Sequence, residues 1–205
     1  MYGKRNPDET RRHLLEAAYE EIHRVGFQAA SLGRILERTG VTKGALYHHF
    51  PNKKALGYAV VDEVIRAQLH AGWVVPLRSA DDPVDGIIRV LSERAAEMGD
   101  HLVQLGCPLN NLAQEMAPVD EGFRRRIEAL FHLWRGGIAE ALRRGQREGR
   151  VREDRVAEDC ALYIVSSIEG CVGAAKSAQD RRVLIACSGG LLDYLEGLRR
   201  GEGHG

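Results

Sequence analysis

The sequence lacks any long apolar run. None of its hydrophobic stretches approaches the ~20 residues that a membrane-spanning helix needs. The basic N-terminus also lacks the apolar core of a secretory signal peptide. These absences exclude a membrane protein, so we expect a cytoplasmic chain with no membrane partner.

Cysteine is also scarce, and its four positions show no metal-binding pattern. Cys107, Cys160, Cys171 and Cys187 form no CxxC pair, and no His/Cys cluster has zinc spacing. We therefore expect no metal site and no cofactor. Cys160 and Cys171 would share a helix face but lie about 16 Å apart along it, too far for a disulfide. Four free thiols are the expected state in a reducing compartment.

Recognisable catalytic signatures are missing as well. The sequence has no Ser/Cys nucleophile elbow and no Gly-rich oxyanion loop. One enzyme alternative is a thiol enzyme with Cys107 as nucleophile and His101 or His132 as base, which requires the base within hydrogen-bond reach. That alternative leaves the basic N-terminal motif unexplained, so we expect no enzyme and no catalytic residues.

A net charge of zero hides an asymmetry along the chain. Residues 1–54 hold ten lysines and arginines against six acidic residues, and the remainder carries the compensating acidic excess. Residues 1–5 are expected as an arm that can add phosphate contacts. With 44% hydrophobic residues the 205-residue chain can bury one large core or two smaller ones. Helical periodicity recurs throughout and no strand pattern appears, which predicts an all-α fold.

The segment Ser31–Phe50 is the most informative part of the sequence. It predicts two short helices joined by a tight turn. Ser31 suits the N-cap of the first helix, Gly40 suits a left-handed helix stop, and Thr42 suits the N-cap of the second. Such helix–turn–helix pairs either read DNA or serve as plain structural hairpins.

The exposed face of the second helix favours the DNA-reading alternative. It offers small groups where a backbone must approach closely, beside a cation, a hydroxyl and an imidazole: Thr42, Lys43, Gly44, Tyr47 and His48. Such a surface suits the major groove of DNA.

The run TGVTKGALYHHFPNKKAL resembles the signature of the TetR (tetracycline-repressor) family of transcriptional regulators. The glycine, the valine–threonine cap, the YHHF run and the lysines opening the next helix match over about residues 8–60. Gly33 departs from a good helix pattern, since glycine costs about 1 kcal/mol against alanine there. The resemblance implies a three-helix DNA-binding domain at residues 1–50. It also implies a larger helical domain for effector binding and dimerisation at residues 51–205.

This resemblance suggests roles for particular side chains in binding double-stranded DNA. Lys43 is the residue expected to reach a base edge, while Thr42, Tyr47, His48 and Lys53 are expected to hold phosphates. A helix from Lys53 to Val75, ended by Pro76, would connect the DNA-binding domain to the body.

The last two predicted helices, Arg155–Ala178 and Arg181–Leu198, are rich in small residues. Tight packing within one chain is one explanation. The resemblance favours the other, a two-fold homodimer in which both helices join a four-helix bundle. A dimer would read an inverted-repeat operator, because one short recognition helix contacts too few base pairs.

Five residues of the body are candidates for binding a small-molecule effector. Cys107 precedes a helix N-terminus, where the macrodipole favours a thiolate. The others are Asn110, Trp134, Glu169 and Lys176, polar or aromatic positions within apolar helices. Core packing is the alternative for Cys107 and Trp134, and a favourable cation near a helix end is the alternative for Lys176. We expect a ligand-responsive regulator, a repressor rather than an activator, released by an effector that acts either noncovalently or as a thiol-reactive compound at Cys107. A scaffold without DNA binding would leave Lys43 and Tyr47 unexplained.

Overall fold

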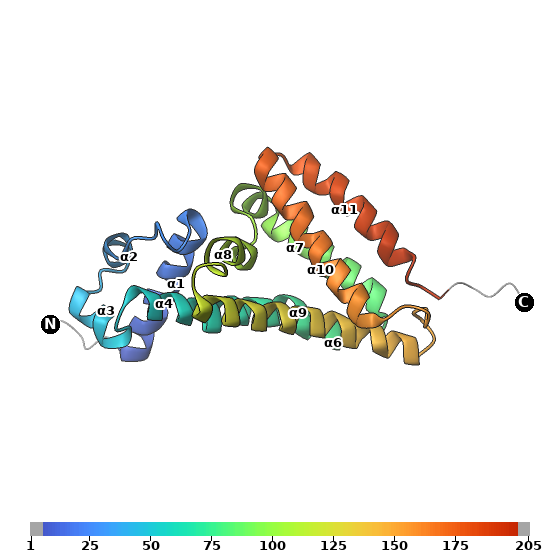
Figure 1. Cartoon of the computed structure of the whole chain (residues 1–205), viewed down its shortest axis with the longest axis horizontal. Coiled ribbons are helices and arrows are strands. Elements are labelled where there is room, and N and C mark those ends of the chain that lie inside the picture. Colours follow the sequence, from blue (N-terminus) through green and yellow to red (C-terminus); the bar gives the residue numbers. More distant parts are fainter. Residues whose placement is uncertain (1–5, 201–205) are drawn as a thin grey trace, which may run out of the picture. The chain divides into compact units, whose positions relative to one another are not determined.

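The computed structural model describes residues 6–200, most of them helical (Figure 1). Its helices are α1 (Pro7–Val25), α2 (Leu32–Thr39), α3 (Lys43–His49), α4 (Lys53–Ala59), η1 (Val60–Ile65), α5 (Arg66–Leu69), η2 (His70–Val74), α6 (Val75–Arg78), α7 (Pro83–Leu105), α8 (Pro108–Met116), α9 (Glu121–Arg147), α10 (Ala157–Ala178) and α11 (Arg181–Glu196). Strand-like pairing in the described span is limited to one isolated bridge, Val151 with Arg199. The predicted all-α fold is confirmed. The arm expected at residues 1–5 lies outside the described residues.

The chain divides into two compact units, each assembled from separate stretches of sequence. Unit 1 takes in the residues through Ala67 together with Pro108–Glu128. Unit 2 takes in Gln68–Cys107 and the residues from Ala129 onward. Among the described helices, none combines the length and apolarity needed to cross a membrane.

Unit 1 is built around α1, whose two ends are capped by Asn6 and Gly26. The Asn6 side chain accepts a hydrogen bond from the backbone N–H of Asp8 (3.1 Å), and proline occupies the first turn. Gly26 ends the helix with φ +83°, a conformation that favours glycine. Leu14 and Ala18 are fully buried on the face that packs against α2 and α4.

The helix expected from Lys53 to Val75 is not one regular α-helix. Two π-helical segments, η1 and η2, interrupt it. The expectation that Pro76 ends the helix is wrong, because Pro76 lies in the first turn of α6, which continues to Arg78. Val75, the residue before Pro76, donates its backbone N–H to the His70 carbonyl five residues earlier, which is the hydrogen-bond pattern of a π-helix. Proline is tolerated there because the first turn of a helix does not need its missing N–H.

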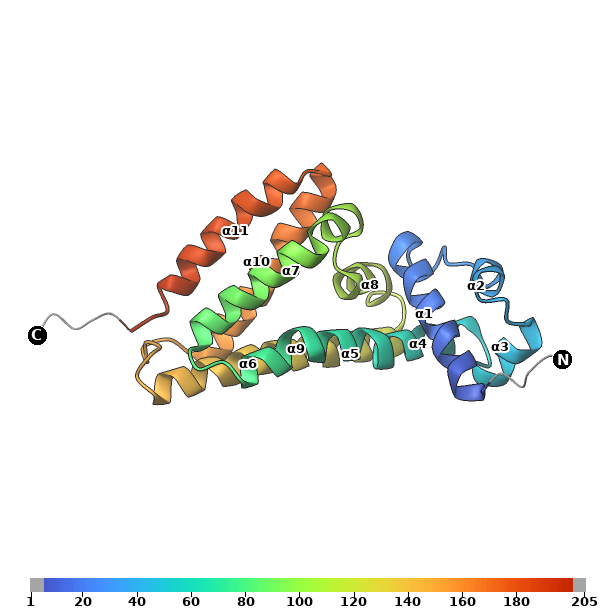
Figure 2. The ribbon, with the colours of Figure 1, turned by 180° about the vertical axis from the view of Figure 1, so that it is seen from behind.

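Unit 2 is centred on three long helices. α10 and α11 run antiparallel, side by side, and both contact α7 (Figures 1 and 2). Gln179 takes the left-handed conformation (φ 51°) at the end of α10, and Asp180 caps α11 by accepting from the Arg182 N–H (2.8 Å). Because this turn is short, residues of α10 and α11 that lie equally far from it in the sequence face each other.

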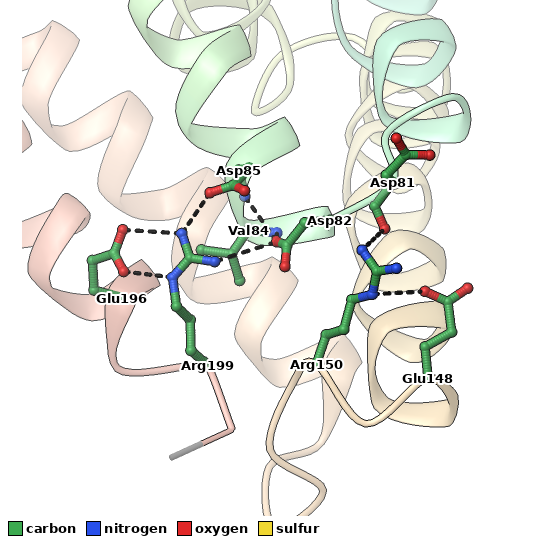
Figure 3. A network of polar contacts seen from close by, with 8 residues as sticks. All are labelled: Asp81, Asp82, Val84, Asp85, Glu148, Arg150, Glu196 and Arg199. Carbon is green, nitrogen blue, oxygen red and sulfur yellow. Dashed lines mark hydrogen bonds and ion pairs between the residues drawn. The ribbon is translucent and has the colours of Figure 1, made fainter. Parts of the chain in front are cut away.

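An arginine cluster holds the end of α11 against the start of α7 (Figure 3). The Arg199 guanidinium donates to Asp85 (2.6 Å) and Glu196 (2.5 Å) and lies 3.4 Å from Asp82. The hydrogen bonds to Glu196 and Asp85 raise the pKa of Arg199 above its ordinary value. Arg150 donates to a backbone carbonyl in the loop before α7 (2.7 Å). Residues more than a hundred positions apart thus close this end of the unit.

The expectation of four free thiols is wrong. Cys171 on α10 and Cys187 on α11 form a disulfide with a Cα–Cα distance of 5.4 Å, while Cys107 and Cys160 are free. The spacing along one helix bears only on Cys160 and Cys171, whereas the bonded cysteines lie on two facing helices. Their nearly equal distances from the turn at Gln179 were the available signal.

Candidate nucleic-acid interface and effector cavity

The turn between α2 and α3 is built from the predicted capping residues. Ser31 Oγ accepts from the Arg34 N–H (3.4 Å), and Thr42 Oγ1 accepts from the Ala45 N–H (3.2 Å). Gly40 between them has φ +60°, the left-handed conformation expected of a glycine stop. These caps fix where α2 ends and where α3 begins.

The five residues predicted on α3 share one exposed surface. Tyr47 is 42% exposed, and the Lys43 ammonium lies 6.0 Å from the centre of its ring. A methyl group added at Gly44 would meet no atom within 4 Å, so the backbone there is open to close approach. Leu46, on the opposite side of α3, is completely buried and anchors the helix. Thr42 and His48 complete the exposed set.

Lys53 differs from the other predicted DNA contacts because its ammonium already has a partner. Its Nζ donates to the Gln28 carbonyl (2.9 Å) and lies 5.0 Å from the centre of the Phe27 ring. The side chain therefore stabilises the turn between α1 and α2. Its phosphate contact stays a prediction.

Glu21 is a structural residue of the interface that sequence reasoning missed. Its carboxylate is 7% exposed, pairs with Arg24 (2.7 Å) and Arg34 (2.6 Å), and accepts from the Ser31 N–H (3.1 Å). Burial alone would raise the pKa of Glu21, but the hydrogen bonds outweigh it and the pKa is lowered. Its position on the apolar stripe of α1 was the only signal in the sequence.

Glu115, on α8, is a second missed residue. Its two carboxylate oxygens accept from the backbone N–H groups of Phe27 and Gln28, both at 2.8 Å. A Cβ at Gly26 would lie 2.9 Å from the same carboxylate. The turn that leads from α1 to α2 therefore depends on a side chain almost ninety positions later, which no local pattern reveals.

A third carboxylate joins α4 to the start of α9 within unit 1. Asp120 accepts from the Tyr58 hydroxyl (2.6 Å) and the Phe123 N–H (2.9 Å), and it pairs with Lys54 (2.9 Å). The hydrogen bonds from Tyr58 and Lys54 hold the pKa of Asp120 well below its ordinary range. The same bond to Asp120 raises the pKa of Tyr58.

The five predicted effector residues are divided between the two units. Asn110 belongs to unit 1, whereas the other four belong to unit 2. Cys107 is half-buried and packs against an apolar cluster that contains Cys171. Trp134 is 4% exposed, its ring centre lies 5.0 Å from that of Trp73, and its Nε1 has no hydrogen-bond partner in the described structure. The buried Glu169 and the half-buried Lys176 lie on α10.

Unit 2 contains a cavity of about 260 Å³ whose walls are largely apolar. Eight leucine, isoleucine and valine side chains from α7, α10 and α11 line it: Leu91, Leu102, Ile168, Val172, Leu184, Ile185, Leu191 and Leu192. Trp73, Arg94 and the disulfide residue Cys171 also contribute. None of the five predicted effector residues is among its described lining residues, so their role in effector binding stays a prediction.

Four glycines of α10 and α11 face open space in the single chain. A methyl group added at Gly170, Gly173, Gly189 or Gly190 would meet no atom within 4 Å. Large apolar side chains on the same two helices are exposed: Leu162 (50%), Tyr163 (50%), Ile185 (64%) and Leu192 (36%). Close packing within one chain therefore does not explain these glycines.

Two protein families match the chain, one in each half. Residues 14–60 match the family described as bacterial regulatory proteins, tetR family. Residues 83–189 match the family described as transcriptional regulator LmrA/YxaF-like, C-terminal domain. The N-terminal match contains α2 and α3 with their caps.

Individual proteins agree with the family matches. An HTH-type transcriptional regulator in the lacX 3′ region of Lactococcus lactis subsp. lactis is 29% identical over 185 residues, which cover 90% of each chain. The HTH-type transcriptional regulator LmrA of Bacillus subtilis (strain 168) is 25% identical over 92% of this chain and 97% of its own. A solved TetR transcriptional regulator from Chloroflexus aurantiacus J-10-fl is 26% identical over 95% of this chain and 98% of its own, with a TM-score of 0.82. These matches are to transcriptional regulators rather than enzymes.

Proposed function

Because the chain belongs to the TetR family of transcriptional regulators, we propose that it is a homodimeric repressor released from its operator by a small molecule. The exposed face of α3 carries this proposal. It combines a cation, a hydroxyl and an imidazole with an open glycine, on a helix anchored by a fully buried leucine. We assign DNA binding to residues 1–50 and regulation to residues 51–205, in a cytoplasmic protein.

Contacts to DNA would divide between reading and positioning. Lys43, at the exposed start of α3, would donate to a guanine edge in the major groove. Thr42, Tyr47 and His48 would hold phosphates and set the register of the helix. Lys53 would add a phosphate contact with the N–H donors that its bond to Gln28 leaves available.

Dimerisation would use the exposed faces of α10 and α11. The open glycines allow a second copy to approach closely, and the exposed leucine, isoleucine and tyrosine side chains supply apolar surface to bury. A two-fold dimer would present two copies of α3 to an inverted repeat. Its half-site centres would be about 34 Å apart, or a multiple of that distance.

Release would follow from effector binding to the regulatory region. A ligand shifts the population of DNA-binding conformations only by its differential affinity for them. Noncovalent binding is the form we favour. The covalent form, in which a thiol-reactive compound acts at Cys107, predicts that Cys107→Ser abolishes release by such a compound. Equal release of wild type and mutant would reject the covalent form.

Gel-shift titrations over a salt series, with DNA from upstream of the protein's own gene, test the proposal. Wild type should bind specifically, with affinity falling as salt rises. Lys43→Ala should cost about 1–3 kcal/mol of specific binding and relax sequence preference. Lys53→Ala should weaken all sequences about equally and flatten the salt slope by about one unit. The absence of specific, salt-dependent binding would favour a scaffold instead.

A further inference from the structure

We propose that the cavity in unit 2 binds a small organic acid, with its apolar body among the aliphatic side chains and its carboxylate on Arg94. The inference rests on the proposed function in one respect, because it names the chemical class of the effector. The cavity volume, about 260 Å³, lies near the lower end of the range for ligand pockets and suits a compact molecule.

Arg94 is the polar group whose surroundings point to an anion. Its guanidinium is half-buried at the cavity wall, 5.9 Å from the centre of the Trp73 ring. No carboxylate of the described residues forms an ion pair with Arg94. A cation partly removed from water beside apolar walls is costly without a counterion. The cation–π contact with the ring occupies none of the guanidinium N–H donors, so they are available for a carboxylate.

The second arginine at the cavity is already engaged. Arg181 pairs with Asp100 (3.2 Å) and donates to the Ala95 carbonyl (3.4 Å). The contrast assigns anion recognition to Arg94 and a structural role to Arg181.

The backbone beside Arg94 is shaped to admit its guanidinium. A Cβ at Gly72 would lie 2.3 Å from Arg94 Nη1, so only a glycine leaves this space empty. Gly72 and Trp73 belong to η2, and π-helical turns inside α-helices occur frequently at functional sites. The π-helical turn, the glycine and the tryptophan together hold one arginine at the edge of an apolar cavity.

Two matched sets of probes test the ligand class: octanoate, octan-1-ol and octylammonium, and 3-phenylpropanoate with 3-phenylpropan-1-ol. The sequence has two tryptophans. Trp73 lines the cavity and the Trp134 ring lies against it at a tilt, with the ring centres 5.0 Å apart, so intrinsic fluorescence reports on binding directly. At least one acid should bind about 10- to 100-fold more tightly than its alcohol, the effect of hydrogen bonds to a charged group. The ammonium compound should be weaker still. Equal affinities for acid and alcohol, or no binding by either acid, would overturn the proposal.

Variants locate the anion site. Arg94→Met keeps the aliphatic stem and should abolish the preference for acid over alcohol. Gly72→Ala should displace the flexible guanidinium and weaken acid binding while leaving the melting temperature nearly unchanged. Arg89→Met, at an exposed arginine of the same helix that pairs with Glu93, is the matched control and should retain the preference. Retention of the preference by both Arg94→Met and Gly72→Ala would also overturn the proposal.

The gel shift of untreated protein separates this inference from the proposed function. Specific operator binding without acid-selective fluorescence would overturn the ligand class alone. Acid-selective binding by a protein that recognises no operator would support the anion site and overturn the role as a repressor.

Discussion

The helix–turn–helix region of unit 1 and the cavity of unit 2 are stabilised by different kinds of contact. In unit 1, the carboxylates of Glu21, Glu115 and Asp120 hold turns and helix starts that lie far apart in the sequence. In unit 2, apolar packing of α7, α10 and α11 surrounds a cavity, and a disulfide joins two of these helices. Directional bonds fix the geometry with which α3 is presented. Apolar contacts around a cavity can repack, which suits the proposed response of this region to a ligand.

The largest expected effect concerns the uncovered faces of unit 2. Gly173→Leu should leave the single chain folded, because a Cβ added there meets no atom within 4 Å, but it should force the proposed dimer apart. Sedimentation should then show a monomer, and specific operator binding should fall to the detection limit. Gly136→Leu, at an equally open glycine on α9, is the control. A fully dimeric Gly173→Leu protein would place the interface elsewhere.

The disulfide should have the next largest effect. It closes a loop with a sequence separation of 16, for which chain entropy suggests about 3 kcal/mol of stabilisation. Dithiothreitol should therefore lower the free energy of unfolding of wild type, and thiol titration should rise from two reactive groups to four under denaturing conditions. The double variant Cys171→Ser/Cys187→Ser should not respond to reductant, whereas Cys107→Ser should respond like wild type. A wild-type protein indifferent to reductant would contradict the cross-link.

Neighbouring glutamates on α1 test the importance of buried carboxylates in unit 1. Glu21→Ala should cost about 1.5–3 kcal/mol, since it removes charged hydrogen bonds and leaves the Ser31 N–H without its acceptor. Glu20→Ala breaks only an exposed pair with Arg38 and should cost less than about 1 kcal/mol. Denaturant titrations of the two variants give the comparison directly. Equal costs would show that the buried carboxylate has no special role.

The smallest effect is a difference in acid sensitivity. The pKa values of Asp120 and Glu21 are lower in the folded protein than in the unfolded chain. Their stabilisation is therefore fully present above the unfolded pKa, about 4, and is lost as pH falls through the folded pKa. Asp120→Asn should lower stability at neutral pH and reduce its loss on acidification. Tyr58→Phe removes the largest contribution to the lowered pKa of Asp120 and should act in the same direction. If the free energy of unfolding of both variants falls with decreasing pH as it does in wild type, Asp120 is not a source of the acid sensitivity.

Local signals in the sequence predicted much of the fold and the exposed face of α3. Ser31, Gly40 and Thr42 act within a few residues of themselves, so their types and spacing were sufficient. Glu115 and Arg94 were not predictable, because each takes its role from partners on other helices. A charged residue on a helix surface looks the same whether it faces water or a distant turn. Cys171 and Cys187 required knowing which helices face each other.

Unit 1 is assembled from two separate stretches of the chain, and this affects when it can fold during synthesis on the ribosome. Gly57 leaves room for the rings of Phe27 and Phe123, which pack 4.6 Å apart, and Asp120 and Glu115 complete the same structure. At ~5–20 residues synthesised per second, several seconds pass between the synthesis of the first three helices and the synthesis of these partners. A nascent chain of about sixty residues would thus carry the whole recognition sequence without its supports. The ability to read DNA would therefore mature only after translation has passed the start of α9.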